Sequence, residues 1–183
     1  MMCATRPPAA PSSPQPGSSR TSGAGPFTAG ELEEVWSDWS GYSPVLADVM
    51  LVLARTGLRW SEARALTVAD ADPEQLVVDK SASERGPLRR LADGQARRVP
   101  VPTRVRPVVR RLVAARDADE LLFTTSLGGP LRRDAVLRRL NWSETAHGRR
   151  LEDLRTTAAA LWLAEGVAPV TVREWMGPTR LAG

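Results

Sequence analysis

The sequence predicts an α+β fold that is mainly helical and contains a small antiparallel β-sheet. Residues 46–54 are apolar except for Asp48, a length that suits a buried helix and is too short to cross a bilayer. Two short β-like runs, 76–79 and 98–101, flank a polar stretch that contains glycine, as expected for two strands of one sheet. A chain of 183 residues has room for one hydrophobic core, or for a core and a tail.

One domain boundary follows from composition. Residues 1–26 are rich in Pro, Ser, Gly and Ala and offer little to bury, so we expect a disordered tail followed by a folded domain at 27–183. Cys3 is the only cysteine, which excludes a disulfide or zinc framework and favours a reducing compartment. The tail has no apolar core of a secretory signal, so we expect a cytoplasmic protein that does not contact membranes.

Local signals place the first helices. Thr28 and Glu31 have capping-box spacing, which predicts a helix from there to about Trp39. Pro44 falls in the first turn of the apolar helix, and Gly57 suits the left-handed residue that ends it. Ser61 is then the expected N-cap of the next helix.

The second half is also helical by pattern. Residues 104–116 form a predicted basic amphipathic helix with Pro107 in its first turn. Residues 131–145 and 151–166 follow as two more helices, and a short one starts at Pro169 and ends at Gly177-Pro178.

Two distant motifs carry a resemblance. Residues 56–63 read Thr-Gly-Leu-Arg-Trp-Ser-Glu-Ala, and residues 151–159 read Leu-Glu-Asp-Leu-Arg-Thr-Thr-Ala-Ala. A short helix ending in Trp-Met-Gly at 175–177 follows the second motif. In order and spacing these motifs resemble the two arginine boxes of the tyrosine recombinases, the phage integrase family, over about residues 26–183. The resemblance implies the catalytic-domain fold of that family and a role in DNA integration and recombination on double-stranded DNA.

The resemblance also implies a mechanism. In the family a tyrosine attacks the scissile phosphate and forms a covalent link to DNA, so no metal or nucleotide cofactor is implied. Arg59 and Arg155 match the two arginines that bind the phosphate oxygens, a task that suits the forked, permanently charged guanidinium. From the residues alone, Arg59 could instead be a cation at a helix C-terminus, and Arg155 a solvated residue paired with Glu152 at i,i+3.

The other positions of the family's site are less well matched. Lys80, the only lysine, is the candidate general acid, although the family's lysine position aligns nearer Arg90 or Leu91, and Lys80 could equally be a solvated turn residue. Glu152 stands where the family has histidine; we expect its carboxylate to pair with the arginines and compete with phosphate. An acid in the first turn of a helix would explain Glu152 equally well.

The nucleophile is the main departure. The only tyrosine is Tyr42, before the buried helix, whereas the family's tyrosine follows the last box. We therefore expect this chain not to cleave DNA alone, and we expect a monomer in solution, because the family's ring-like assemblies depend on exchange of the C-terminal segment. His147, the sole histidine, matches no family position and reads as a loop residue.

DNA contacts outside the boxes are expected from the basic helices. Arg90, Arg104, Arg132 and Arg133 are candidates for phosphate contacts without sequence readout. The alternative is that these arginine-rich faces are merely solvated. Two other classes remain open: a non-enzymatic helix-turn-helix regulator, with residues 156–177 as the DNA-reading pair, and a remnant without DNA affinity.

Overall fold

The computed structural model describes residues 25–92 and 94–178. The predicted tail, 1–26, lies outside the described residues except for Gly25 and Pro26. In chain order the helices are α1 (Ala29–Tyr42), α2 (Pro44–Thr56), α3 (Trp60–Ala63), η1 (Val68–Asp70), η2 (Thr103–Val105), α4 (Arg106–Val113), α5 (Arg133–Arg139), α6 (Trp142–Thr145), α7 (Asp153–Ala164) and α8 (Pro169–Met176). The strands are β1 (Gln75–Val78), β2 (Lys80–Ala82), β3 (Leu88–Arg90) and β4 (Arg97–Pro100). The α+β, mainly helical prediction is confirmed, and among the described residues no helix is long and apolar enough to span a bilayer.

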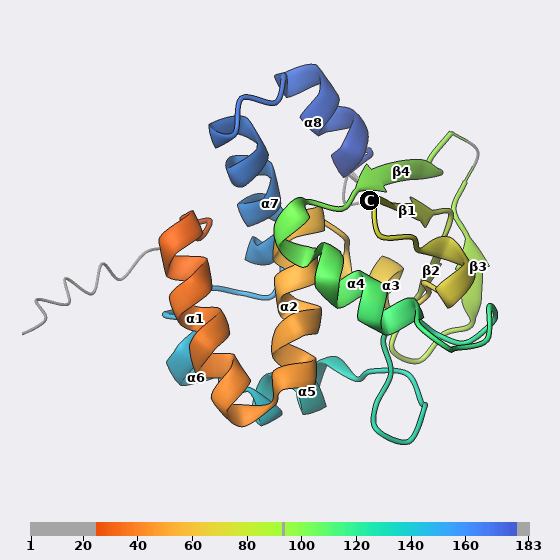
Figure 1. The fold of residues 1–183 in the computed structure, drawn as a ribbon, viewed down its shortest axis with the longest axis horizontal. Helices are drawn as coiled ribbons and strands as arrows, with labels where there is room; N and C mark the ends of the chain where they lie inside the picture. The colour runs from red at the N-terminus through yellow and green to blue at the C-terminus, as the bar shows by residue number, and fades with distance from the viewer. Residues whose placement is uncertain (1–24, 93, 179–183) are drawn as a thin grey trace, which may run out of the picture.

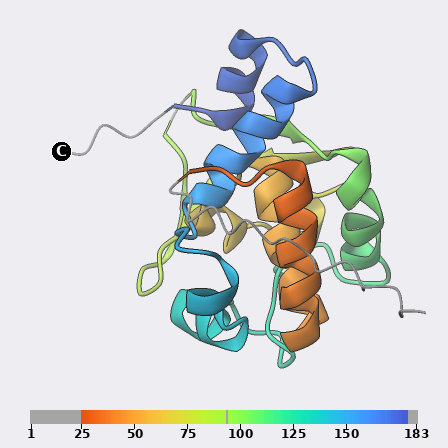
Figure 2. The ribbon, with the colours of Figure 1, turned by 90° about the vertical axis from the view of Figure 1, so that its left-hand side faces the viewer.

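The centre of the fold is α2, against which α1 and α7 pack (Figures 1 and 2). Its apolar run is buried, as predicted, and Pro44 lies in its first turn. Gly57 ends the helix with φ +62°, the left-handed conformation that the sequence predicted. Upstream, the capping box between Thr28 and Glu31 opens α1 as predicted.

An aromatic cluster joins α1 to the later helices. The Trp39 indole is fully buried and stacks on Trp142 with ring centroids 4.9 Å apart, while its Nε1–H donates to Thr145 Oγ1 at 2.9 Å. Phe27 meets the edge of Trp39 at 6.3 Å. Burying these rings supplies a large part of the hydrophobic stabilisation at this end of the domain.

The single helix predicted over 131–145 is wrong. Asn141 adopts φ +49°, which breaks the segment into α5 and α6. Asparagine tolerates this conformation better than most residues, and the break turns Trp142 inward against Trp39.

Two antiparallel strand pairs lie beside the helices, where the sequence predicted one. β1 pairs with β4, with buried Leu76 opposite buried Val99, as expected. The connection between them, predicted to be loose, contains a second pair, β2 and β3, in which Lys80 lies opposite Arg90. These short strands have no buried face, so they lack the alternation that reveals a strand in a sequence.

Two helix starts also differ from expectation. Arg59, not Ser61, is the N-cap of α3, because the Glu62 side chain accepts the Arg59 backbone N–H at 2.8 Å. The basic helix predicted over 104–116 is shorter: η2 precedes α4, and Pro107 lies in the first turn of α4 as predicted.

At the other end of the chain, α8 packs on α7 through Trp162 and Trp175, whose ring centroids are 5.2 Å apart, and α8 also contacts β4.

Candidate nucleic-acid-binding site

The site begins at the link between α2 and α3. Because Gly57 turns the chain sharply, Arg59 follows directly at the N-terminus of α3. Its Nη1 donates to Glu62 Oε1 at 2.9 Å, and its Nη2 donates to the carbonyl of Pro178. Glu62 is only 1% exposed, so this carboxylate fixes the direction of Arg59 from inside the fold.

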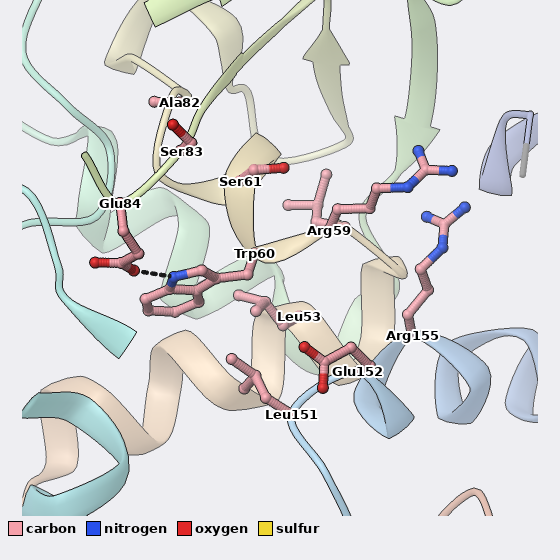
Figure 3. Close-up of a pocket in the computed structure, with 11 residues that line it drawn as sticks. Leu53, Arg59, Trp60, Ser61, Ala82, Ser83, Glu84, Leu151, Glu152 and Arg155 are labelled. Carbon is pink, nitrogen blue, oxygen red and sulfur yellow. Dashed lines mark hydrogen bonds between the residues drawn. The ribbon is translucent and has the colours of Figure 1, made fainter. Parts of the chain in front are cut away.

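Arg155 reaches the same place from α7. Its Nη1 donates to the Gly57 carbonyl and its Nη2 to the Met176 carbonyl, so the two boxes meet through the α2–α3 link. Figure 3 shows the guanidinium ends of Arg59 and Arg155 next to each other, on the side away from Trp60 and Glu84. Pairing of Arg155 with Glu152, the alternative reading of this residue, is not what the structure shows.

A third arginine, which sequence reasoning missed, completes the cluster. Arg97 on β4 donates from Nη1 and Nη2 to the two Glu62 oxygens at 3.0 and 2.8 Å, and from Nε to the Trp175 carbonyl at 2.7 Å. Strand alternation places Arg97 on the same face as buried Val99, and this was the available signal. Arg97 therefore ties β4 to α3 and to the end of α8.

The cluster carries excess positive charge. Arg59, Arg97 and Arg155 contribute three positive charges against the one negative charge of Glu62, which leaves +2. Burial, and then the nearby charges of Arg59 and Arg97, lower the pKa of Arg155 to about 10, against the opposing effect of Glu62. Arg155 stays protonated near neutral pH, and an anion bound here would relieve the repulsion.

A cavity of about 390 Å³ opens beside the two box arginines (Figure 3). It is lined by residues from α2, the α2–α3 link, α3, the end of β2 with the loop that follows, and the segment that enters α7: Leu53, Leu58, Arg59, Trp60, Ser61, Ala82, Ser83, Glu84, Leu151, Glu152 and Arg155. Trp60 and Glu84 are further lining residues that sequence reasoning did not single out.

Lys80 is engaged elsewhere. Its Nζ lies 2.8 Å from Asp70 Oδ2 and 3.4 Å from Thr67 Oγ1, and it does not line the cavity. Burial raises the pKa of Asp70, but the hydrogen bonds from Lys80 and Thr67 lower it by more, so the carboxylate is ionised and holds the lysine.

Glu152 lines the cavity but does not pair with Arg59 or Arg155, and that expectation is wrong. Its Oε1 and Oε2 accept from Nη1 and Nη2 of Arg133 at 2.7 and 3.1 Å. Arg133 begins α5, and its forked guanidinium takes both oxygens, so Glu152 is turned away from the arginine cluster.

The remaining predicted DNA contacts are dispersed. Arg104 forms a bidentate pair with Glu33, with the shortest contact at 2.7 Å, and its guanidinium lies 4.7 Å from the Trp36 ring. Arg90, whose side chain is 84% exposed, lies 3.1 Å from Asp79. Arg132 is exposed at the N-cap of α5. Of the predicted residues, the structure therefore brings Arg59, Arg155 and Glu152 to the cavity and Arg133 to Glu152.

Tyr42 and His147 lie outside the cavity. The Tyr42 hydroxyl, at the end of α1, accepts a hydrogen bond from Asn141 Nδ2 at 3.3 Å, and His147 is a loop residue with φ +51°. Among the described residues no group of His, Cys, Asp and Glu is arranged to hold a metal ion.

The chain belongs to the phage integrase family, whose model matches residues 42–182. Its fold is similar to that of the Tn1549 transposon integrase in complex with circular intermediate DNA, with a TM-score of 0.68, 20% identity, and coverage of 85% of this chain and 59% of that one. The XerA recombinase gives a TM-score of 0.60 at 13% identity, covering 85% of this chain and 61% of that one. The lambda integrase catalytic core gives 0.57 at 16% identity, covering 86% and 94%. Among curated proteins none matches.

These comparisons confirm the family resemblance and the fold predicted from the two boxes. At 20% identity or below, the solved structures show the fold alone. The chain spans less than two thirds of the Tn1549 integrase and XerA structures, so the activity of a whole recombinase does not transfer with the fold.

Proposed function

We propose that this chain binds double-stranded DNA in a process of DNA integration or recombination, and that Arg59 and Arg155 hold one phosphodiester of the duplex. The observation that carries the proposal is the convergence of these two arginines, from α3 and α7, beside one cavity. Membership of the phage integrase family supports it, as does the DNA present in the Tn1549 integrase complex.

The geometry suits a phosphate. Each guanidinium carries more N–H donors than the contacts to Glu62 and the backbone carbonyls use, so donors remain on both arginines for an anion. The +2 charge of the cluster favours a ligand with concentrated negative charge, and the same arrangement would stabilise the charge that grows on phosphate oxygens during strand cleavage.

Cleavage itself needs groups that the residues described by the structure do not bring to the cavity. The one tyrosine, Tyr42, is bonded to Asn141 at the end of α1, and Lys80 is held by Asp70. The position of the family's histidine is occupied by Glu152, an ionisable acid paired with Arg133. We infer that the chain binds DNA without cutting it unless another polypeptide segment supplies a nucleophile.

We assign residues 27–183 to a partial catalytic domain that acts at the nucleoid as a monomer. Sedimentation of the chain with and without a short duplex tests the oligomeric state. One protein molecule in the free state is expected, and a symmetric oligomer would contradict the assignment.

A duplex-DNA titration over a salt series tests the proposed function. The wild type should lose affinity steeply as salt rises, because DNA binding releases counterions. The Arg59→Ala/Arg155→Ala variant should bind at least about tenfold more weakly at low salt, and its log–log salt slope should be smaller by about 1, as expected for the loss of one phosphate contact.

The control variant is Arg98→Ala/Arg116→Ala. It removes the same charge from an exposed arginine of β4 and from an arginine paired with Glu120, and neither residue lines the cavity. Similar losses in both double variants would mean that DNA senses only net charge, and an unchanged Kd in the cavity variant would overturn the proposal.

A further inference from the structure

The cavity is larger than a phosphate contact requires. Its volume of about 390 Å³ lies within the range of pockets that enclose small ligands, about 300–1,000 Å³. Arg59 and Arg155 occupy one end, while Trp60 and Glu84 lie together away from them in Figure 3. The space between these two ends is large enough for a small ligand.

The walls suit a flat, partly apolar group. The indole of Trp60 is half-buried and forms one side, and the leucines at positions 53, 58 and 151 supply apolar surface. Trp60 is fixed in place, because its Nε1–H donates to Glu84 Oε1 at 2.7 Å. A rigid indole is a good stacking surface for a nucleobase.

At this end of the cavity, the Glu84 carboxylate favours a ligand group that donates a hydrogen bond. Its Oε1 accepts from Trp60 Nε1 and from the Arg133 backbone N–H at 2.7 and 3.0 Å. Its Oε2 has no hydrogen-bond donor among the residues that the structure describes, and the side chain is 35% exposed. Burial raises the pKa of Glu84, but hydrogen bonds from Trp60 and Arg133 and the charges of Arg64 and Arg132 lower it by more, so the carboxylate is an acceptor only.

We propose that the cavity is a nucleotide site that takes one unpaired nucleotide, its phosphate on Arg59 and Arg155, its base against Trp60 and an exocyclic amino group on Glu84 Oε2. The inference rests on the proposed function, since the same two arginines hold the phosphate. Adenine, cytosine and guanine carry such an amino group, whereas thymine presents a single N–H between two carbonyl oxygens that repel a carboxylate. The site should therefore discriminate against thymine.

The test is a titration of the ¹⁵N-labelled 183-residue chain with dCMP, dTMP and deoxyribose 5-phosphate, followed by the indole N–H signals in NMR spectra. The Trp60 signal is assigned by its loss in Trp60→Phe. We expect dCMP to bind about fivefold or more tightly than deoxyribose 5-phosphate, a ratio that corresponds to the lower end of base–aromatic stacking. The dissociation constant of dTMP should lie closer to that of the sugar phosphate.

Three variants and a control separate the contribution of stacking on Trp60 from that of the hydrogen bond to Glu84. Trp60→Leu should reduce dCMP binding to the level of the sugar phosphate, while Trp60→Phe, which keeps an aromatic face, should retain most of the difference and guards against misfolding of the leucine variant. Glu84→Gln can both donate and accept, so it should remove the preference for dCMP over dTMP. Trp36→Leu is the control, because Trp36 contacts Arg104 and does not line the cavity.

The outcomes distinguish this inference from the proposed function. Equal binding of all three compounds would overturn the base site while leaving phosphate binding intact. A base preference that survives in Trp60→Leu would also overturn it. If none of the three compounds binds, the nucleotide site is refuted, and the duplex titration above decides separately whether DNA is bound.

Discussion

Replacing Glu62 by glutamine should destabilise the protein more than any other single change at the site. The Glu62 carboxylate is 1% exposed and accepts four hydrogen bonds, two from Arg59 and two from Arg97, between 2.8 and 3.0 Å. A glutamine keeps the shape but offers one acceptor oxygen and no charge. Three arginines would then face one another without a counter-charge.

The expected loss of stability in Glu62→Gln can be estimated from the burial of Arg97, the partner of Glu62. Arg97 is only 7% exposed, and leaving such a charge without its partner costs about 3–5 kcal/mol. A small domain has a total stability of about 5–15 kcal/mol, so the loss should be a large part of it. Replacing both partners, as in Glu62→Gln/Arg97→Met, should recover part of the loss, because no unpaired charge remains.

The stability difference between the wild type and Glu62→Gln should become smaller as the pH falls. Burial raises the pKa of Glu62, but hydrogen bonds and charge from Arg97, with the N–H of Arg59, lower it by more, so the folded pKa lies below the ordinary value of 4.5. A depressed carboxyl pKa contributes stability that is fully present above the unfolded value and is lost as pH falls through the folded pKa. The difference between wild type and Glu62→Gln should be constant from neutral pH to about 5 and shrink below about 4.5.

Urea unfolding, followed by tryptophan fluorescence at several pH values, measures the free energy of unfolding of the wild type and of Glu62→Gln. Glu144→Gln, at an exposed position of α6, is the matched control and should stay within about 0.5 kcal/mol of the wild type. The reasoning fails if Glu62→Gln loses less than about 1 kcal/mol at pH 7, or if its deficit grows as the solution is acidified.

Two further predictions concern neighbours of the cluster. Glu152→Gln should change the free energy of unfolding by no more than about 1 kcal/mol, because the pair with Arg133 is exposed. It should tighten duplex binding several-fold at low salt, because it removes a carboxylate beside Arg155. Unchanged or weaker binding in fluorescence anisotropy would contradict this prediction. Gly57→Ala should cost about 1–3 kcal/mol in thermal or urea unfolding, because φ is +62° and the new Cβ would lie 2.9 Å from Met176 Sδ. Its control is Gly30→Ala in α1, where the added Cβ meets nothing within 4 Å; equal effects at the two positions would refute the argument.

Local signals predicted the backbone around the site well. Thr28, Pro44 and Gly57 each act through geometry that is determined within a few residues of themselves, and the structure has all three as expected. The two arginine boxes were found differently, because their order and spacing resemble those of the tyrosine recombinases; local signals alone left Arg59 and Arg155 with other readings.

The partners of charged side chains could not be predicted in this way. Glu152 pairs with Arg133 from another helix, and Arg97 pairs with Glu62, 35 residues earlier in the chain. Strand alternation places Arg97 on the face of buried Val99, but it does not identify the carboxylate that Arg97 meets. Only the tertiary position of β4, which brings Arg97 to Glu62 of α3 and to the Trp175 carbonyl of α8, decides between them.

The missed hairpin has a similar origin. β2 and β3 have no buried face of their own, and β2 is held to α3 by the Arg64 Nη1 donation to the Ala82 carbonyl at 2.9 Å. The same loop brings Glu84 to Trp60 at 2.7 Å. Because these contacts are tertiary, the residue pattern of 80–96 carries no trace of them.

The central claim is that Arg59 and Arg155 bind the same phosphate of DNA. Titrating ¹⁵N-arginine-labelled protein with a short duplex, and following the side-chain Nε–H signals, tests it most directly, because neither Nε takes part in the hydrogen bonds found among the described residues. Both signals should move together and saturate at one DNA concentration, while the buried Arg64, whose Nε donates to the Leu131 carbonyl at 2.8 Å, stays unchanged. Movement confined to exposed arginines such as Arg90 and Arg132, with Arg59 and Arg155 unaffected, would contradict the account.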